Sequence, residues 1–176
     1  MAKNTDTTPT VNNTSALILP GAEADALASK LIQSGFAEER TFWIGNPADK
    51  KQPVYFGRLI GEGGVQFIEK MGAAPDKETG EVPMSEIPTY LFHPLDPVSF
   101  NPIVNRMDTV LCSAMVAQAC KKYKTLADAS GGFADILFRW NGKIETRKGR
   151  QLNDISVIHR IVDADGKVVT SGQSGT

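Results

Sequence analysis

A β-hairpin signal in the C-terminal half of the chain constrains the fold more than any other feature. An aromatic and aliphatic run at residues 133–140 leads directly into Asn141-Gly142, and a second apolar run follows at residues 154–162. Asn-Gly favours a tight turn in which both central residues have positive φ, and such turns join antiparallel strands. The sequence therefore predicts two antiparallel strands that pair in one sheet and are joined by a basic loop at residues 141–153.

The first half of the chain predicts one helix and several short strands. Apolar residues recur three and four apart over residues 22–34, and Gly35 follows at a position typical of a helix end. Gly61-Glu62-Gly63-Gly64 is expected to connect two strands, and residues 75–88 form a long polar loop. The expected strands are residues 40–44, 53–60, 65–70 and 89–92, with a further edge strand at residues 167–170.

A second helix is expected after residue 101. Asn101 is a capping residue type, and Pro102 suits the first helical position. An amphipathic stripe supports this helix, and three lysines near its C-terminus suit the helix dipole. The stripe is Met107, Val110, Leu111, Ala114, Met115 and Ala117.

The two cysteines, Cys112 and Cys120, fall within this expected helix. Eight residues of helix separate them by about 12 Å along the axis, too far for a disulfide. They are therefore expected to be free, buried thiols in a reducing compartment.

Positive charge is concentrated in one part of the chain. Residues 1–88 contain 8 Lys and Arg against 12 Asp and Glu, whereas residues 89–176 contain 11 against 8. Residues 121–150 alone contain 8 cations against 3 anions. Local fields of this kind steer charged partners more than the overall charge does.

Composition and length predict a soluble, cytoplasmic protein with one domain. No apolar run approaches the roughly 18 residues of a membrane-spanning helix, and residues 1–14 lack the profile of a signal peptide. Residues 1–15 and 171–176 are polar and without periodicity, so they are expected to be a flexible arm and tail around a domain at residues 16–170.

The expected order of elements over residues 53–162 resembles the OB fold. That fold is a five-stranded barrel with a helix between its third and fourth strands, and here an N-terminal helix would be an addition. The fold class expected is thus a β-rich α+β protein. The resemblance implies that residues 61–64 and 141–153 are the two loops with which OB folds hold nucleic acid.

The basic loop is the candidate site. Phosphate groups require exposed cations, and unpaired bases stack on exposed aromatic rings. Phe138 or Trp140 could supply such a ring. Ile136, Phe138 and Trp140 share one strand face by alternation, which favours the core for Ile136 and Phe138 and leaves both alternatives open for Trp140 at the strand end. The candidate nucleic-acid-binding residues are Arg58, Lys121, Lys122, Lys124, Arg139, Trp140, Lys143, Arg147, Lys148 and Arg150.

Catalytic signatures are lacking. His93 and His159 are the only histidines, and neither stands at the spacing of a metal ligand. The glycines at residues 61–64 do not form a dinucleotide or phosphate-loop motif. The sequence thus predicts no enzyme, no metal and no cofactor.

Two function hypotheses follow. The first is a non-enzymatic protein that binds single-stranded DNA, or RNA, with weak sequence selectivity, a role that suits phage or mobile-element replication. The second is a structural or assembly protein of a phage or a larger complex, whose polar arm and long loop reach neighbouring subunits. Self-association is compatible with both hypotheses, and neither involves a membrane.

Overall fold

The structure, a computed structural model, describes residues 21–70 and 72–174, with the side chains described as far as Thr170. The chain forms two compact units, Met1–Phe36 and Ala37–Thr176. The arm predicted at residues 1–15 lies outside the described residues. In the first unit, helix α1 (Gly21–Gln33) ends where Gly35 adopts a φ of 92°, as expected for this stop position.

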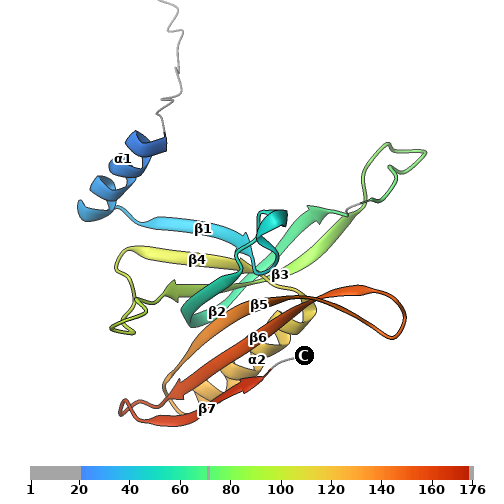
Figure 1. Ribbon diagram of the computed structural model, residues 1–176. Coiled ribbons are helices and arrows are strands. Elements are labelled where there is room, and N and C mark those ends of the chain that lie inside the picture. Colours follow the sequence, from blue (N-terminus) through green and yellow to red (C-terminus); the bar gives the residue numbers. More distant parts are fainter. Residues whose placement is uncertain (1–20, 71, 175–176) are drawn as a thin grey trace, which may run out of the picture. The chain divides into compact units, whose positions relative to one another are not determined.

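The second unit contains a seven-stranded mixed sheet in the order β1-β4-β3-β2-β5-β6-β7. All neighbouring strands are antiparallel except β1 and β4, which are parallel. Figure 1 shows the strands, which are β1 (Glu38–Trp43), β2 (Val54–Glu69), β3 (Met84–Pro94), β4 (Arg106–Leu111), β5 (Phe133–Glu145), β6 (Gln151–Val162) and β7 (Val168–Ser174).

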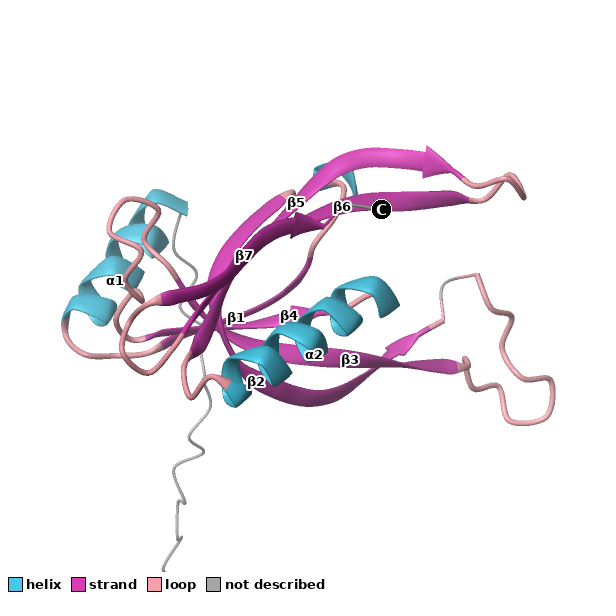
Figure 2. Cartoon of the chain, turned by 90° about the horizontal axis from the view of Figure 1, so that it is seen from below, coloured by secondary structure: helices cyan, strands magenta, loops and turns pink. Residues whose placement is uncertain are grey.

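Helix α2 (Ala114–Ala129) lies in the concave face of the curved sheet (Figure 2). Its buried residues, Val116, Cys120, Tyr123 and Ala127, repeat three and four apart and pack on the inner face of the sheet. This spacing places them on one helix face, so α2 covers the core that the inner face of the sheet provides.

The inner face of the sheet carries a chain of aromatic rings. Phe42, Tyr55, Phe92 and Phe138 follow one another edge to face, with centroid separations of 5.0, 5.6 and 6.0 Å. This geometry is favourable for the ring quadrupoles and adds to the gain from burial. Phe138 is fully buried, so it is a core residue and offers no stacking face.

The expected five-stranded OB barrel is wrong. The glycines at residues 61–64 lie inside β2, where they produce two register shifts against β3 instead of a loop. Glycine relieves the crowding of a bulged strand, so the same residues that suggested a connection allow one long strand to bend. Strands β1 and β7 remain as two open edges of the sheet.

The expected helix after Asn101-Pro102 is also wrong in its position. Residues Arg106–Leu111 form β4, between β1 and β3, and α2 begins only after Ser113, whose Oγ accepts a hydrogen bond from the Val116 amide at 3.5 Å. Met107, Val110 and Leu111 fit a helical stripe, but Thr109 and Val110 are β-branched and favour a strand. The segment pairs with both β1 and β3, and this pairing favours the strand over the helix that the apolar spacing suggested.

The hairpin predicted around Asn141-Gly142 exists, but its turn lies elsewhere. Strand β5 continues through Gly142, whose φ of 125° accompanies a register shift against β6. The chain reverses at Thr146–Arg150, where Gly149 has a φ of 72° and the Thr146 amide bonds the Arg150 carbonyl at 2.8 Å. Both glycines use their freedom at positive φ, one for a bulge and one for the turn.

The chain's C-terminal segment returns to the sheet as β7. A turn at Asp163–Gly166 precedes it, and β7 pairs with β6 as the expected edge strand. This strand continues to Ser174, so residues 171–174 of the expected tail have strand backbone.

Candidate nucleic-acid interface

The ten sequence-predicted site residues lie on four different surfaces. Lys143, Arg147, Lys148 and Arg150 are exposed on the β5–β6 hairpin. Lys121, Lys122 and Lys124 belong to α2, on the concave side. Arg58 and Arg139 lie on the opposite, outer face of the sheet, and Trp140 lies on its inner face.

Trp140 is therefore not beside the cations as a free stacking platform. The indole is partly buried against the core, and its Nε1 donates a hydrogen bond to Asn153 Oδ1 at 3.1 Å. Its register partner is the buried Ile155. Strand alternation thus assigns Trp140 to the same face as Ile136 and Phe138.

Two of the three predicted lysines of α2 are engaged locally. Lys124 forms an ion pair with Asp128 one turn along the helix, and the ammonium group of Lys122 lies 5.4 Å from the centroid of the Tyr123 ring. Because α2 and the outer sheet face lie on opposite sides of the sheet, these lysines do not extend the surface that carries Arg58 and Arg139.

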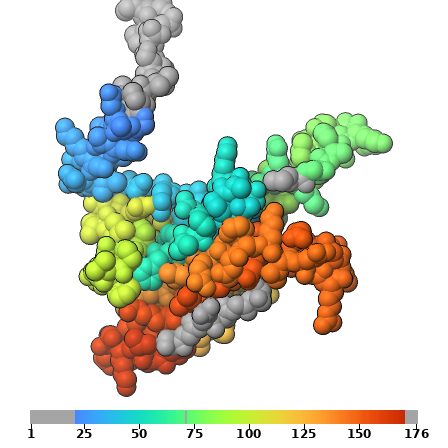
Figure 3. Space-filling view, viewed as in Figure 1, coloured from blue at the N-terminus to red at the C-terminus, as the bar shows by residue number. Residues whose placement is uncertain are grey.

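The hairpin tip is a cationic projection. Figure 3 shows it, in orange, projecting from the second unit below the green β2–β3 hairpin, which also projects. Within the described residues, Arg147, Lys148 and Arg150 form no ion pair with a carboxylate. Their charges are solvated and available to a partner, while their side chains contribute little to folding.

The outer face of the central strands bears cations beside apolar side chains. Register sets Val54 next to Arg139, Phe56 next to Leu137, and Leu137 next to Ile158. Side chains on one face of paired strands lie close enough to form a continuous surface. The outer-face patch consists of Val54, Phe56, Arg58, Phe100, Leu137, Arg139, Ile158 and Arg160.

One buried carboxylate organises two arginines of this patch. Asp135 Oδ1 accepts from Arg58 Nε at 2.7 Å, and Asp135 Oδ2 accepts from Arg160 Nε and Nη2 at 2.9 and 2.8 Å. The Asp135 side chain is 1% exposed, whereas those of Arg58 and Arg160 are 22% and 34% exposed. Two cations share one anion, so the cluster keeps a net positive charge at the surface.

Aromatic rings hold the same two guanidinium groups. The Arg58 guanidinium lies 3.4 Å from the centroid of the Phe133 ring, and that of Arg160 lies 5.0 Å from the Phe100 ring. Guanidinium planes stack well on aromatic faces. Both arginines are consequently fixed in orientation before any ligand arrives.

Phe100 reaches the patch from the loop between β3 and β4. Asp96 Oδ1 accepts hydrogen bonds from the amides of Val98 and Ser99 at 3.0 and 2.7 Å, and the Phe100 amide bonds the Asp96 carbonyl at 2.9 Å. Hydrogen bonds lower the pKa of Asp96: the largest contribution comes from the Ser99 amide, the next from the Ser99 hydroxyl and then the Val98 amide. An ionised Asp96 thus orders this loop at neutral pH.

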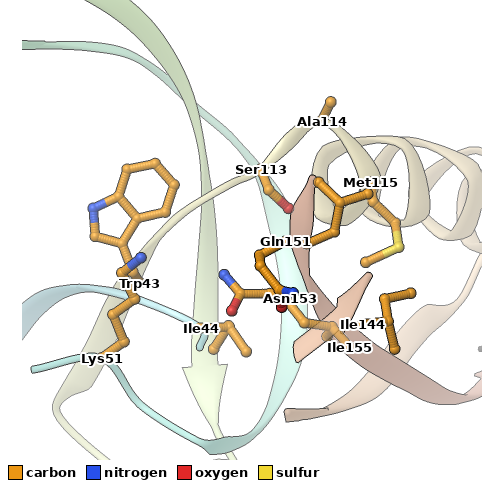
Figure 4. A pocket seen from close by; sticks show the side chains of 11 residues that line it. Trp43, Ile44, Lys51, Ser113, Ala114, Met115, Ile144, Gln151, Asn153 and Ile155 are labelled. Carbon is orange, nitrogen blue, oxygen red and sulfur yellow. The ribbon is translucent and has the colours of Figure 1, made fainter. Parts of the chain in front are cut away.

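An apolar pocket of 530 Å³ lies on the inner side, between the end of β1, the start of α2 and the base of the hairpin. Figure 4 shows Trp43 and Lys51 on one side and Met115, Ile144 and Ile155 on the other. The Lys51 ammonium lies 5.7 Å from the centroid of the Trp43 ring. This pocket contains none of the predicted site residues.

The inner face also contains an ion pair at its β1 side. Arg40 donates two hydrogen bonds to the fully buried Asp108, at 2.9 and 2.8 Å. The hydrogen bonds that Arg40 donates to Asp108 raise the pKa of Arg40, and burial, together with the charge of Asp108, raises the pKa of the Tyr55 hydroxyl. These groups connect β1, β4 and β2 and have a structural role.

Catalytic groups do not converge in the described part of the chain. No three His, Cys, Asp or Glu side chains among those residues are placed to hold a metal ion. His93 is exposed and its Nδ1 lies 3.1 Å from the Arg106 carbonyl, whereas His159 stacks on Tyr123 at 4.0 Å on the other side of the sheet.

The cysteines are not in one helix. Cys112 follows β4 and Cys120 lies on α2, and both are buried and free. The neighbouring Cys112 thiol, and then burial, raise the pKa of Cys120. Nucleophilic chemistry requires the thiolate, so this environment favours packing over reactivity.

Of the eight patch residues, the sequence-predicted site contained only Arg58 and Arg139. Phe56 and Arg160 could have been found by alternation, because they lie opposite the buried positions of β2 and β6. Phe100 carried no such signal, because a loop with an Asx turn determines its position.

Comparisons with known proteins gave no relative. No protein-family model, no curated protein and no solved structure matches this chain. No helix in the described residues is long and apolar enough to cross a membrane.

Proposed function

We propose that this protein binds single-stranded nucleic acid, without catalysis, along a track that combines the outer-face patch with the cationic hairpin tip. The observation that carries the proposal is the pairing of fixed, partly exposed guanidinium groups with exposed apolar and aromatic side chains on one sheet face. Cations neutralise phosphates, and flat side chains accept unpaired bases.

The two parts of the track are joined by β5. Leu137 and Arg139 lie on the outer face, and the same strand continues into the hairpin that bears Lys143 and Arg147. From Leu137 to Arg147 an extended strand covers about 33 Å. A track of this length offers a single strand several successive phosphate contacts, each of which adds to affinity and to salt dependence.

A single strand fits this surface better than a duplex. The bases of a duplex are stacked on each other and show only their edges in the grooves, whereas those of a single strand can turn toward aromatic and guanidinium planes. The patch has few charged acceptors and many apolar contacts, so weak sequence selectivity is expected. The chemistry does not favour DNA over RNA.

Fluorescence anisotropy with a labelled oligonucleotide tests this proposal. The single strand should bind with micromolar or better affinity at low salt, and the logarithm of the binding constant should fall by about 0.7 per neutralised phosphate for each tenfold rise in salt. A duplex of the same sequence should bind more weakly. Absence of binding at low salt, or binding that salt does not change, would refute the proposal.

An assembly role is the second candidate, and the β2–β3 hairpin favours it. Val65, Phe67 and Met84 are 51%, 63% and 52% exposed there. Exposed apolar clusters of this kind commonly mark contacts with other proteins. Size-exclusion chromatography with light scattering tests this candidate. A discrete oligomer that dissociates in the Phe67→Ser variant would support it.

A further inference from the structure

A cavity lies beside the arginine cluster on the outer face. It has a volume of 330 Å³, and Phe56, Phe100, Leu137, Ile158 and Arg160 contribute to its lining. The two phenylalanine rings meet edge to face with centroids 5.9 Å apart. Most of the lining is apolar, and its charged side chains are Arg160 and the buried Asp135 that binds Arg160. A ligand that suits this cavity is therefore flat or apolar, with an acceptor atom for the guanidinium group.

The cavity is formed before a ligand binds. The Leu95 amide donates to the Phe56 carbonyl at 3.1 Å, and the Ile103 amide donates to the Pro94 carbonyl at 2.8 Å, so both ends of the Phe100 loop are tied to the sheet. Phe100 itself has a φ of 58°, a left-handed conformation that a bulky residue adopts only where its surroundings impose it. The loop thus holds Phe100 in a strained backbone conformation that directs its ring to the cavity.

The guanidinium group of Arg160 lies at the polar end of the cavity, where it is a hydrogen-bond donor of fixed orientation. Arg160 uses Nε and Nη2 to bind Asp135, and its second terminal nitrogen has no hydrogen bond among the described residues. A guanidinium group donates to carbonyl oxygens and ring nitrogens on base edges. The Phe100 ring packs on the same guanidinium group and adds an aromatic side chain to this end of the cavity.

We propose that this cavity holds one nucleobase of a bound single strand, packed against Phe56 and Phe100 with an acceptor on its edge directed to Arg160. The inference rests on the proposed function and adds a base-binding subsite to it. Backbone affinity then comes from the hairpin cations, whereas preference for base-containing over base-free polymer comes from the cavity. The two contributions are separable because they reside on different elements.

The experiment compares oligothymidylate with an abasic oligomer of the same length and phosphate number. The unchanged protein should bind the base-containing oligomer about tenfold or more tightly, which corresponds to one stacked base. Phe100→Ala should reduce this ratio to within about twofold and leave affinity for the abasic oligomer unchanged. Ile158→Trp, which fills the cavity and removes no wall, should have the same effect.

Val98→Ala is the matched control, because Val98 belongs to the same loop, is 86% exposed and does not line the cavity. It should retain the full ratio. If neither oligomer binds, the proposed function fails, and the subsite with it. If both bind equally to the unchanged protein, or if Phe100→Ala and Ile158→Trp both retain the ratio while folded, the subsite is overturned and the proposed function stands.

Discussion

Trp140 donates a hydrogen bond from its Nε1 to Asn153 Oδ1 at 3.1 Å, across the two strands of the projecting hairpin. This bond fixes the indole at the inner base of the hairpin, where the ring packs on the core and its polar atom is satisfied. Removal of the ring should consequently affect folding and not binding.

Trp140→Ala is expected to lower the free energy of unfolding by about 3 kcal/mol, the lower end of the range for a core tryptophan, because the residue is only partly buried. Urea unfolding measures this change. The folded fraction should bind oligonucleotide as the unchanged protein does. A loss of affinity at full stability would instead place Trp140 in the binding surface.

Arg147→Ala combined with Lys148→Ala should weaken nucleic-acid binding and leave stability within about 0.5 kcal/mol, because exposed tip cations without ion pairs contribute little to folding. Loss of two phosphate contacts should also reduce the salt dependence by roughly 1.4 logarithmic units per tenfold change in salt. The control is Lys70→Ala with Lys77→Ala, a pair of exposed lysines in the β2–β3 hairpin. An equal effect of both pairs would mean that charge alone, and not the β5–β6 hairpin, governs binding.

Cys112 and Cys120 should react slowly with a thiol reagent in the folded protein and rapidly after unfolding. Both are at most 2% exposed, and the raised pKa of Cys120 keeps its thiolate scarce. The release of a chromophore from a disulfide reagent gives both rates. Rapid reaction of both thiols in the folded state would contradict the packing of α2 on the sheet.

Stability should rise with pH where His159 titrates. Burial, and then the charge of Lys122, lower the pKa of His159 below its ordinary value of 6.5. As the pH falls below 6.5, His159 binds a proton in the unfolded chain but not yet in the folded protein. The free energy of unfolding therefore decreases until the pH passes the lowered pKa of His159 in the folded state. Its buried Nδ1, which has no hydrogen-bond partner among the described residues, agrees with a neutral ring.

Melting temperatures from pH 5 to 8 measure this effect, and His159→Phe should remove its share of the dependence while retaining the stacking on Tyr123. His93→Gln is the control, because His93 is exposed on the other side of the sheet. An identical pH dependence for the unchanged protein and His159→Phe would exclude His159 as its source.

Local patterns in the sequence predicted elements better than their connections. The alternation of Ile136 and Phe138 correctly assigned the inner face of β5, and the polar turn at residues 163–166 correctly predicted an edge strand. The order of strands depends on pairing between distant segments, such as β1 with β4, for which a single sequence carries no direct signal. The glycines of β2 and Gly142 were ambiguous because bulges and turns require the same backbone freedom.

The candidate site was predictable in part. The hairpin cations follow from charge density alone, and Arg58 and Arg139 were named although the face that unites them was not. Their grouping depends on the lateral register of β2 with β5, which sets Arg58 beside Asp135. The sequence places Lys121, Lys122 and Lys124 on a helix but does not say on which side of the sheet that helix packs, so only the structure separates them from this surface.

Chemical-shift mapping of the backbone amides during titration with a single-stranded oligonucleotide tests the binding track most directly. Shifts should concentrate in three segments, namely residues 54–60, 96–101 and 135–160, with smaller changes in α2 and in the loop at residues 72–83. Shifts confined to the concave side, around Trp43, Lys51 and the α2 lysines, would contradict binding along the outer face, as would a spectrum that the oligonucleotide leaves unchanged at low salt.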